Sequence, residues 1–289
     1  QEFIKELEKQ GELKRVKTEV DPDLEIAEIL RREMYSNGPA ILFENVKGHT
    51  MPVLGNAFGS MKRLEIGLEM TDFTEIGHRI TDMTKMDMPS GLLNKIKKLP
   101  ELSKMTASFP KSESSGLVTE ITSTDASFDD LPIIKSWPND AGRFITLGLI
   151  ATKHPETGVR NLLFLLMQII DKTHASMHWQ KHKRGANHGD ISKDRGEKIP
   201  AAIIFGGEPA TVFSSIAPVP EGLDKYLFAG ITRKEGIKTV KCKTIDLDVP
   251  ANAEIVLEGY VDPADIRDEG PFGDHTGYYT PVEPYPTFT

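Results

Sequence analysis

The sequence contains 289 residues, which at about 150 residues per domain suggests two domains. Hydrophobic residues make up 38% and charged residues 27%, a globular composition that excludes disordered, collagen-like and coiled-coil classes. The 43 acidic residues outnumber the 35 Lys and Arg residues, and the net charge of −8 argues against nucleic acid or an anionic membrane as the main partner. We therefore expect a small-molecule ligand.

The single cysteine, Cys242, excludes an internal disulfide and a multi-cysteine zinc site. Residues 1–12 are charged, with a helical pattern and no apolar signal core, and no segment approaches the ~20 apolar residues of a membrane-spanning helix. These features predict a cytoplasmic protein. Because the sequence starts without Met and ends at Thr289 within an alternating apolar pattern, we expect a fragment of a longer chain.

Residues 1–112 are predicted to form a small α/β domain. Asp21 and Pro22 give a helix-start signal, and apolar residues at helical spacing extend that helix to Gly38. The polar segment 109–116 predicts a domain boundary between residues 112 and 113. Apolar patterning predicts strands at 40–46 and 52–56, and amphipathic helices at 60–69, 72–83 and 91–104.

Residues 113–289 are dominated by strand patterns. Residues 144–152 and 161–170 flank a turn at 154–158 and predict an antiparallel hairpin. Further strands are predicted at 201–205, 238–242 and 254–261, and short helices at 180–184 and 222–231. The fold class is therefore α+β, with a mostly antiparallel barrel or sandwich following the N-terminal α/β domain.

The segment 267–279 has the most unusual local composition in the chain. Three glycines and a proline constrain a loop that carries Glu269, Asp274 and His275. Two carboxylates in one loop can share protons and have separated pKa values, as general acid catalysis requires. The alternative is a solvated, turn-rich loop whose acidic residues form local caps.

Two other segments carry residues that could bind ligands, although the Rossmann, P-loop and nucleophile-elbow motifs are absent. His178 and His182 have the spacing of a metal pair on one helical face, but the Glu that a zinc hydrolase needs after His178 is missing. Residues 205–215 predict a strand, a glycine turn and a helix, whose amides and the hydroxyls of Ser214 and Ser215 could bind phosphate. Ordinary surface histidines and an ordinary turn are the alternatives.

Several segments resemble the UbiD family of decarboxylases, which use prenylated FMN. They are residues 19–26, 38–46, 137–138, 177–180, 249–259 and 269–279, the last reading Glu-Gly-Pro-Phe-Gly-Asp-His-Thr-Gly-Tyr-Tyr. The last two are highly specific, and the resemblance covers essentially the whole chain. It implies an N-terminal α/β domain, a central split β-barrel domain at residues 113–289 that binds the flavin, and a C-terminal domain that the sequence does not include.

The resemblance also implies the chemistry. Loss of CO₂ from an unsaturated acid leaves carbanion character, which needs a cofactor as electron sink. Glu269 is implied as the acid that protonates carbon, and Asp274 as its partner in a proton network. Gln168, Ser214 and Ser215 are implied to contact the flavin.

A divalent metal, usually Mn²⁺, is implied to clamp the flavin phosphate through Asn161 and His182, with K⁺ nearby. Two positions depart from the family pattern. Leu166 stands where the family has an arginine that pairs with the two acids and binds the substrate carboxylate, which leucine cannot do. Lys225 stands where a metal-binding glutamate is expected, with Asp224 as the possible substitute. The apolar run 162–167 also suits a strand buried on both faces.

Together these features predict a reversible, non-oxidative decarboxylase of an aromatic or α,β-unsaturated carboxylic acid. A flavin prenyltransferase is the expected cofactor supplier, and a homo-oligomer the expected assembly. The alternative is a catalytically degenerate paralogue, or a non-catalytic subunit on the same fold.

Overall fold

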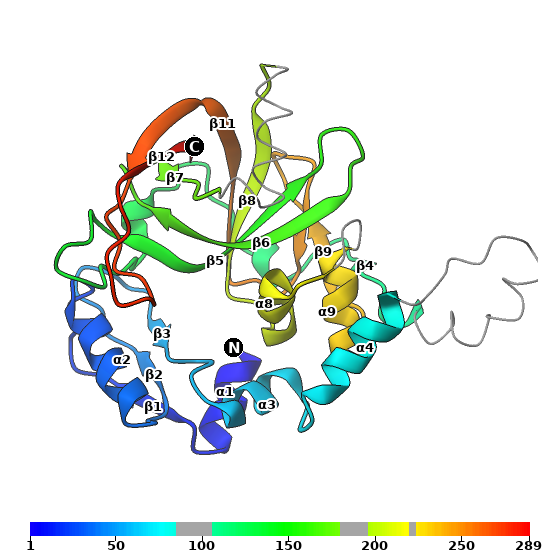
Figure 1. The fold of residues 1–289 in the computed structure, drawn as a ribbon, viewed down its shortest axis with the longest axis horizontal. Coiled ribbons are helices and arrows are strands. Elements are labelled where there is room, and N and C mark those ends of the chain that lie inside the picture. Colours follow the sequence, from blue (N-terminus) through cyan, green and yellow to red (C-terminus); the bar gives the residue numbers. More distant parts are fainter. Residues whose placement is uncertain (85–105, 180–195, 220–223) are drawn as a thin grey trace, which may run out of the picture.

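The computed structural model describes residues 1–84, 106–179, 196–219 and 224–289 (Figure 1). The helices predicted at 91–104 and 180–184, together with His182, lie outside these residues. The helices of the described part are α1 (Glu2–Lys9), α2 (Glu25–Tyr35), α3 (Met61–Leu68), α4 (Thr74–Thr84), α8 (Pro209–Ile216), α9 (Lys225–Arg233) and the 3₁₀ turns η1 (Leu117–Thr119) and η2 (Phe128–Asp130).

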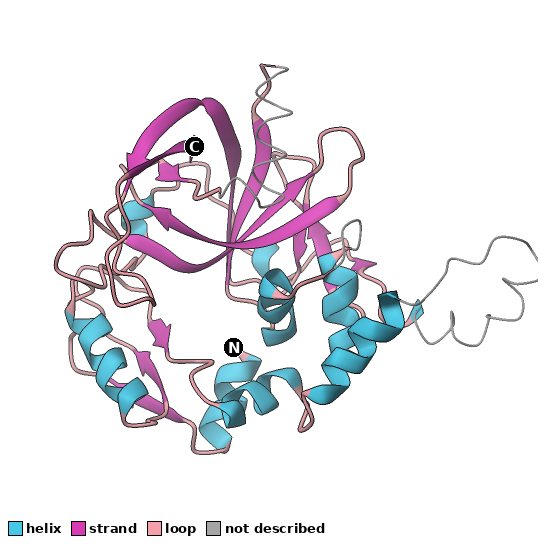
Figure 2. Cartoon of the chain, viewed as in Figure 1, coloured by secondary structure: helices cyan, strands magenta, loops and turns pink. Residues whose placement is uncertain are grey.

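The strands form three sheets (Figure 2). They are β1 (Leu13–Val16), β2 (Ala40–Phe43), β3 (Val53–Gly55), β4 (Lys111–Ser112), β5 (Phe144–Lys153), β6 (Arg160–Gln168), β7 (Ala175–Ser176), β8 (Ile199–Phe205), β9 (Lys238–Lys241), β10 (Asp248–Pro250), β11 (Ile255–Glu269) and β12 (Glu283–Phe288). The sheets have the orders β1-β2-β3, β10-β9-β4 and β6-β5-β8-β11-β12-β7. The chain is thus a mixed α+β protein, as predicted.

The N-terminal elements form the lower rim of the molecule in Figure 1, with α2 next to the small sheet. Ile26 of α2 packs with Ile41 and Phe43 of β2. The predicted start of this helix at Pro22 is wrong, because α2 begins at Glu25. Leu24 has a positive φ of 69°, and the Asp21 carboxylate accepts the Asp23 N–H at 2.9 Å in a tight turn before the helix.

The six-stranded sheet confirms the predicted hairpin, since β5 and β6 pair antiparallel. All its strand pairs are antiparallel, and an isolated bridge between Ile169 and Ala175 links the ends of β6 and β7. Strand β11 is much longer than the predicted 254–261, because it continues past a register shift between Asp262 and Ile266 as a ribbon with β12. Glu269, expected in a loop, is therefore the last residue of a strand.

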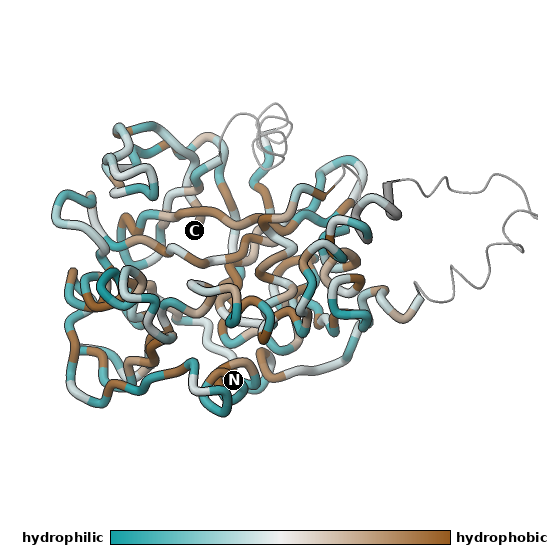
Figure 3. The backbone as a smooth tube through the Cα atoms, turned by 60° about the horizontal axis from the view of Figure 1, so that its bottom comes forward, coloured by the Kyte–Doolittle hydropathy of each residue, from teal (hydrophilic) through white to brown (hydrophobic). Residues whose placement is uncertain are grey.

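The expected burial of the apolar run 162–167 on both faces is found only in part: one face of β6 is buried, whereas on the other face Leu162 is buried and Phe164 and Leu166 are half-buried. Leu163, Leu165 and Met167 belong to one core cluster, whereas Leu162 packs in a second cluster with Tyr226 of α9. Figure 3 shows hydrophobic residues along the central strands and hydrophilic residues in the outer turns. Helices α8 and α9 pack on each other and join the N-terminal helices through a cluster that includes Leu68, Ile76, Ala210 and Phe228.

Among the residues that the structure describes, none of the helices combines the length and apolar character needed to cross a bilayer.

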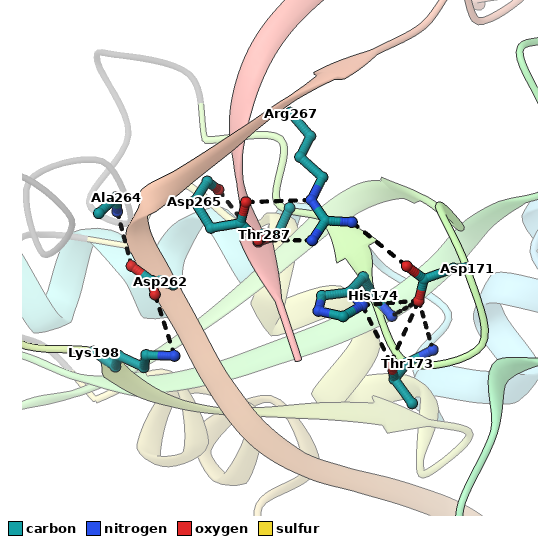
Figure 4. Close-up of polar contacts among 9 residues, drawn as sticks. All are labelled: Asp171, Thr173, His174, Lys198, Asp262, Ala264, Asp265, Arg267 and Thr287. Atoms are coloured by element: carbon teal, nitrogen blue, oxygen red, sulfur yellow. Dashed lines mark hydrogen bonds and ion pairs between the residues drawn. The ribbon is translucent and has the colours of Figure 1, made fainter.

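A polar cluster fixes the ribbon of β11 and β12 against the turn before β7 (Figure 4). The Asp265 carboxylate accepts hydrogen bonds from Thr287 of β12 and from Arg267 at 3.1 Å. Arg267 also reaches Asp171 at 3.5 Å. Burial opposes ionisation of Asp171, but the N–H groups of Thr173 and His174, each at 2.9 Å, and the His174 ring at 2.8 Å lower its pKa to about 2. The cluster thus depends on an ionised Asp171.

Asp171→Asn should flatten the dependence of the unfolding free energy on pH between about pH 4 and pH 2. The folded-state pKa of Asp171 is depressed, so its contribution is present above the unfolded pKa of about 3.9 and is lost as the pH falls through about 2. Urea unfolding across this range measures the slope. Asp125→Asn, which removes an exposed carboxylate, is the control, and a variant curve parallel to the wild type would contradict the prediction.

Candidate active site and the predicted metal site

Glu269 lies where the ends of β6, β7 and β11 meet, and only 5% of its side chain is exposed. Its Oε2 accepts a hydrogen bond from the Ser176 hydroxyl, and its Oε1 lies 2.5 Å from Nδ1 of His178. The Ser176 oxygen itself accepts the Gln168 N–H at 2.8 Å, which directs the hydroxyl proton toward Glu269. The alternative of a solvated carboxylate is therefore wrong for Glu269, because tertiary contacts cover it.

Gln168 holds the chain directly after Glu269. Its side-chain Oε1 accepts the Gly270 N–H at 2.7 Å, so β6 contacts both Glu269, through Ser176, and the start of the following loop. Gly270 has a positive φ of 95°, which favours glycine there. The predicted flavin contact Gln168 thus lies beside the predicted acid.

Asp140 anchors the loop that follows Glu269. This buried carboxylate (4% exposed) accepts the N–H groups of Gly273 at 2.7 Å, Trp137 at 2.8 Å and Ser136 at 3.2 Å. A Cβ on Gly273 would lie 2.2 Å from the Trp137 ring, so the loop passes too close to the indole for any larger residue. The Trp-Pro and Gly-Pro-Phe-Gly segments, singled out separately in the sequence, therefore form one unit.

Asp274 lies in the same loop but contacts a different partner. Its carboxylate is 2.8 Å from Nδ1 of His275, and although burial opposes ionisation, this hydrogen bond holds the pKa of Asp274 below its usual range. Within the described residues, no hydrogen bond joins Asp274 to Glu269. The predicted partnership of the two acids stays a prediction, since the structure brings them into one loop region without direct contact.

His178 does not lie on a helix, so the predicted placement of His178 on one helical face with His182 is wrong for His178. The Met177 N–H donates to the Pro286 carbonyl of β12 at 2.8 Å, which keeps the chain extended after β7. The His178 ring packs on Tyr285, with centroids 4.4 Å apart. Ser176 and His178 were missed as partners of Glu269. Their i, i+2 spacing, which puts two side chains on one face of an extended chain, is the signal that could have found them.

Asn161 and Asp224, the two predicted metal ligands that the structure describes, lie at the other end of β6. Asn161 is buried, and among the described residues neither Oδ1 nor Nδ2 of its side chain has a hydrogen-bond partner. It lines a cavity of about 10 Å³, roughly the space of one water, together with Arg160, Asp224 and Tyr226. Asp224 caps α9 by accepting the Tyr226 N–H at 2.8 Å, and it forms an ion pair with Arg160 at 2.5 Å.

The two hydroxyls of α8 that were predicted to contact phosphate donate hydrogen bonds to backbone carbonyls of the same helix. The Ser214 hydroxyl donates to the Thr211 carbonyl at 2.8 Å, and the Ser215 hydroxyl donates to the Val212 carbonyl at 2.6 Å. The buried ammonium of Lys225 donates to the Ser215 carbonyl at 2.5 Å. The predicted strand, glycine turn and helix are confirmed as β8, Gly206-Gly207 and α8.

The described residues do not fit a divalent metal. Such an ion takes several oxygen ligands with carboxylates among them, whereas Asp224 is committed to Arg160, and Lys225 adds a second cation. Across the described ranges, no group of three His, Cys, Asp or Glu residues could hold a metal ion. The buried amide of Asn161, by contrast, can hydrogen-bond to a small polar group at the cavity of about 10 Å³ beside it.

A cleft of about 1420 Å³ opens elsewhere, where α1 and α3 face the start of α8. Residues that line it include Glu6, Glu65, Glu208, Arg233 and Asn252. Gly207 of the predicted phosphate-binding turn lines it, whereas the described residues predicted around Glu269 and Asn161 do not.

We expect the wild-type protein to bind no stoichiometric Mn²⁺, and Lys225→Glu to gain Mn²⁺ binding, because the change replaces a cation with an oxygen ligand at the expected ligand position. Titration calorimetry with MnCl₂ measures this. Lys225→Gln removes the charge without adding a carboxylate and is the matched control. Tight one-to-one binding of Mn²⁺ by the wild type would contradict the prediction that these residues do not hold a divalent metal.

Comparison with known proteins identifies the family of the chain. Residues 110–289 match the 3-octaprenyl-4-hydroxybenzoate carboxy-lyase Rift-related domain (UbiD), and residues 4–80 match the corresponding N-terminal domain. Uncharacterized proteins of Aquifex aeolicus and Archaeoglobus fulgidus are 47% and 46% identical, over 99% of this chain and 60% and 59% of theirs. The chain therefore spans about 60% of the length of these curated relatives.

Solved structures agree with this relationship. An evolved dimeric form of the UbiD-class enzyme HmfF from Pelotomaculum thermopropionicum, in complex with prFMN, is 27% identical with a TM-score of 0.84 and covers 99% of this chain and 62% of that one. Vanillic acid decarboxylase of Sedimentibacter hydroxybenzoicus, in closed form, is 25% identical with a TM-score of 0.86, over 99% and 60%. From the matched domains and the shared fold, we conclude that the chain belongs to the UbiD family.

Proposed function

We propose that the chain is the N-terminal and flavin-binding part of a cytoplasmic, homo-oligomeric decarboxylase. Its substrate is an aromatic or α,β-unsaturated carboxylic acid, the reaction is reversible, and the cofactor is prenylated FMN made by a flavin prenyltransferase. The observation that carries the proposal is Glu269, a buried carboxylate held at the edge of the sheet in a chain similar to HmfF, which was solved with prFMN.

The two predicted domains are part of this proposal, with the boundary between residues 112 and 113. The second domain is the split β-barrel. The bridge between Ile169 and Ala175, which links the two ends of the six-stranded order, supports that assignment.

Bound flavin supplies the electron sink for the carbanion that loss of CO₂ leaves behind. Asn161, Gln168, Ser214 and Ser215 are the residues proposed to hold it, and the unpaired Asn161 amide supports this. No divalent metal enters the proposal, because Lys225 and the Asp224–Arg160 pair do not fit one.

Glu269 gives its proton to the substrate carbon in decarboxylation and removes one in the reverse reaction. Because Oε2 accepts the Ser176 hydroxyl, Oε1 is the oxygen that gains and loses the proton. Asp274 belongs to the same proton network in this proposal, as a group that stays ionised beside His275.

Glu269→Gln tests the proposal in the complete protein, co-expressed with a flavin prenyltransferase. The wild type should show the visible spectrum of bound flavin and release CO₂ from at least one of 4-hydroxybenzoate, vanillate and cinnamate. Glu269→Gln should keep the flavin and lose at least about 100-fold in CO₂ release, because a general acid contributes that much. A colourless, inactive wild type would instead support the degenerate paralogue.

Leu166→Arg should raise kcat/KM at least about tenfold, because a charge-assisted pair with the substrate carboxylate contributes roughly 1.5–3 kcal/mol. Leu166 is half-buried on β6, two residues before Gln168, and has no group that can pair with a carboxylate. Leu166→Met is the matched control and should bring no gain. Equal rates for both variants, with circular dichroism showing that each is folded, would place residue 166 away from the substrate.

A further inference from the structure

The two carboxylate oxygens of Glu269 have different hydrogen-bond partners. Oε2 is fixed as an acceptor, because the Ser176 hydroxyl is already oriented by the Gln168 N–H. Oε1 faces Nδ1 of His178 at 2.5 Å, and an imidazole nitrogen can either donate a proton to a carboxylate or accept one from a carboxylic acid. Any change in the protonation of Glu269 therefore occurs at its contact with His178.

His178 is the titratable side chain in hydrogen-bond contact with Glu269 among the described residues. The groups expected from the family pattern do not take this place, since residue 166 is leucine and Asp274 pairs with His275. His178 is 18% exposed against 5% for Glu269, so it is the member of the pair nearer to solvent. Its ring is fixed by Tyr285 at 4.4 Å.

We propose that His178 is a positioning residue that shares the proton of Glu269, so that the two side chains act as one proton-carrying unit in the decarboxylation. This rests on the proposed function, in which Glu269 protonates carbon. With one added proton, the pair is imidazolium with carboxylate or imidazole with carboxylic acid. The acid form gives its proton to the carbanion, a C–H bond forms, and one proton from solvent restores the pair.

Other charged groups surround the pair and act on the same proton. Glu283 of β12 accepts a hydrogen bond from the Tyr285 hydroxyl at 2.7 Å, and burial together with Glu283 raises the pKa of Tyr285, so that this phenol stays neutral. The imidazole of His178 also interacts electrostatically with Asp274 in the following loop. Glu269 thus contacts the imidazole directly, Asp274 acts on it from the loop, and Glu283 is linked to it through Tyr285.

His178→Asn tests the proposal in the complete, flavin-loaded protein. The Asn amide can still donate to Oε1 but cannot titrate, so a purely structural role would survive this change. We expect kcat for CO₂ release to fall at least about tenfold and its pH dependence between about pH 5 and pH 8, where imidazoles ordinarily titrate, to disappear, while KM stays within about twofold. Wild-type kcat and pH dependence in His178→Asn would overturn the proposal.

His174→Asn is the matched control. His174 makes the same kind of contact, with Nδ1 at 2.8 Å from the Asp171 carboxylate (Figure 4), whereas the side-chain hydrogen bonds of Glu269 within the described residues go to Ser176 and His178. This variant should keep both kcat and its pH dependence. Equal losses in the two variants would show a general effect of histidine removal and would overturn the proposal.

A second readout does not depend on activity. In protein labelled with ¹⁵N-histidine, Glu269→Gln should move the Nδ1 resonance of His178 and leave that of His174 unchanged. An unmoved His178 resonance overturns the shared proton even if the enzyme decarboxylates its substrate. A moved resonance in a protein that binds no flavin and releases no CO₂ shows instead that the proposed function has failed, and the catalytic role of His178 with it.

Discussion

The burial of the Glu269 carboxylate is the constraint on which the candidate site depends. Removing an ionised carboxyl group from water costs several kcal/mol unless hydrogen bonds and charges compensate. Ser176 and His178 supply that compensation from the segment around β7, and Gln168 orients Ser176 from the end of β6. The ends of three strands must therefore meet at one point, and the loop that begins at Gly270 leaves from there.

The same principle explains why the loop has a defined shape. Asp140 is a second buried carboxylate, and its oxygens are satisfied by three backbone N–H groups that include Gly273. Trp137 then packs where a side chain at position 273 would lie. The acid end of the site is thus built from satisfied polar groups, whereas Asn161 at the other end of β6 is buried with an unpaired amide.

The two ends of β6 therefore differ in the chemistry expected of them, which is proton transfer at Glu269 and metal binding near Asn161. The proton-transfer end retains a carboxylate with one fixed oxygen and one oxygen that faces an imidazole. At the other end of β6, a divalent cation would need negatively charged ligands. Asp224 is instead paired with Arg160, and Lys225 adds a buried ammonium. Among the described residues, this end of β6 thus offers internal ion pairs rather than free carboxylates to a metal ion.

The sequence by itself determined what depends on neighbours along the chain. Apolar runs on either side of the 154–158 turn predicted the hairpin of β5 and β6, and the glycine pair after Phe205 predicted the turn into α8. The segment 269–279 indicated the family that the matched domains confirm. The predicted start of α2 was wrong, because Leu24 has a positive φ and the helix begins only at Glu25, three residues after the Asp21-Pro22 start signal.

Only the tertiary structure decided the environment of Glu269. Its partners Ser176 and His178 are 93 and 91 residues away in the chain, and local composition carries no record of such contacts. The glycines and proline after Glu269 suggested an exposed loop, but β11 continues to Glu269 because β12 pairs with it over that length. Sequence patterns report local backbone preference, whereas burial and protonation depend on which distant segments the fold brings together.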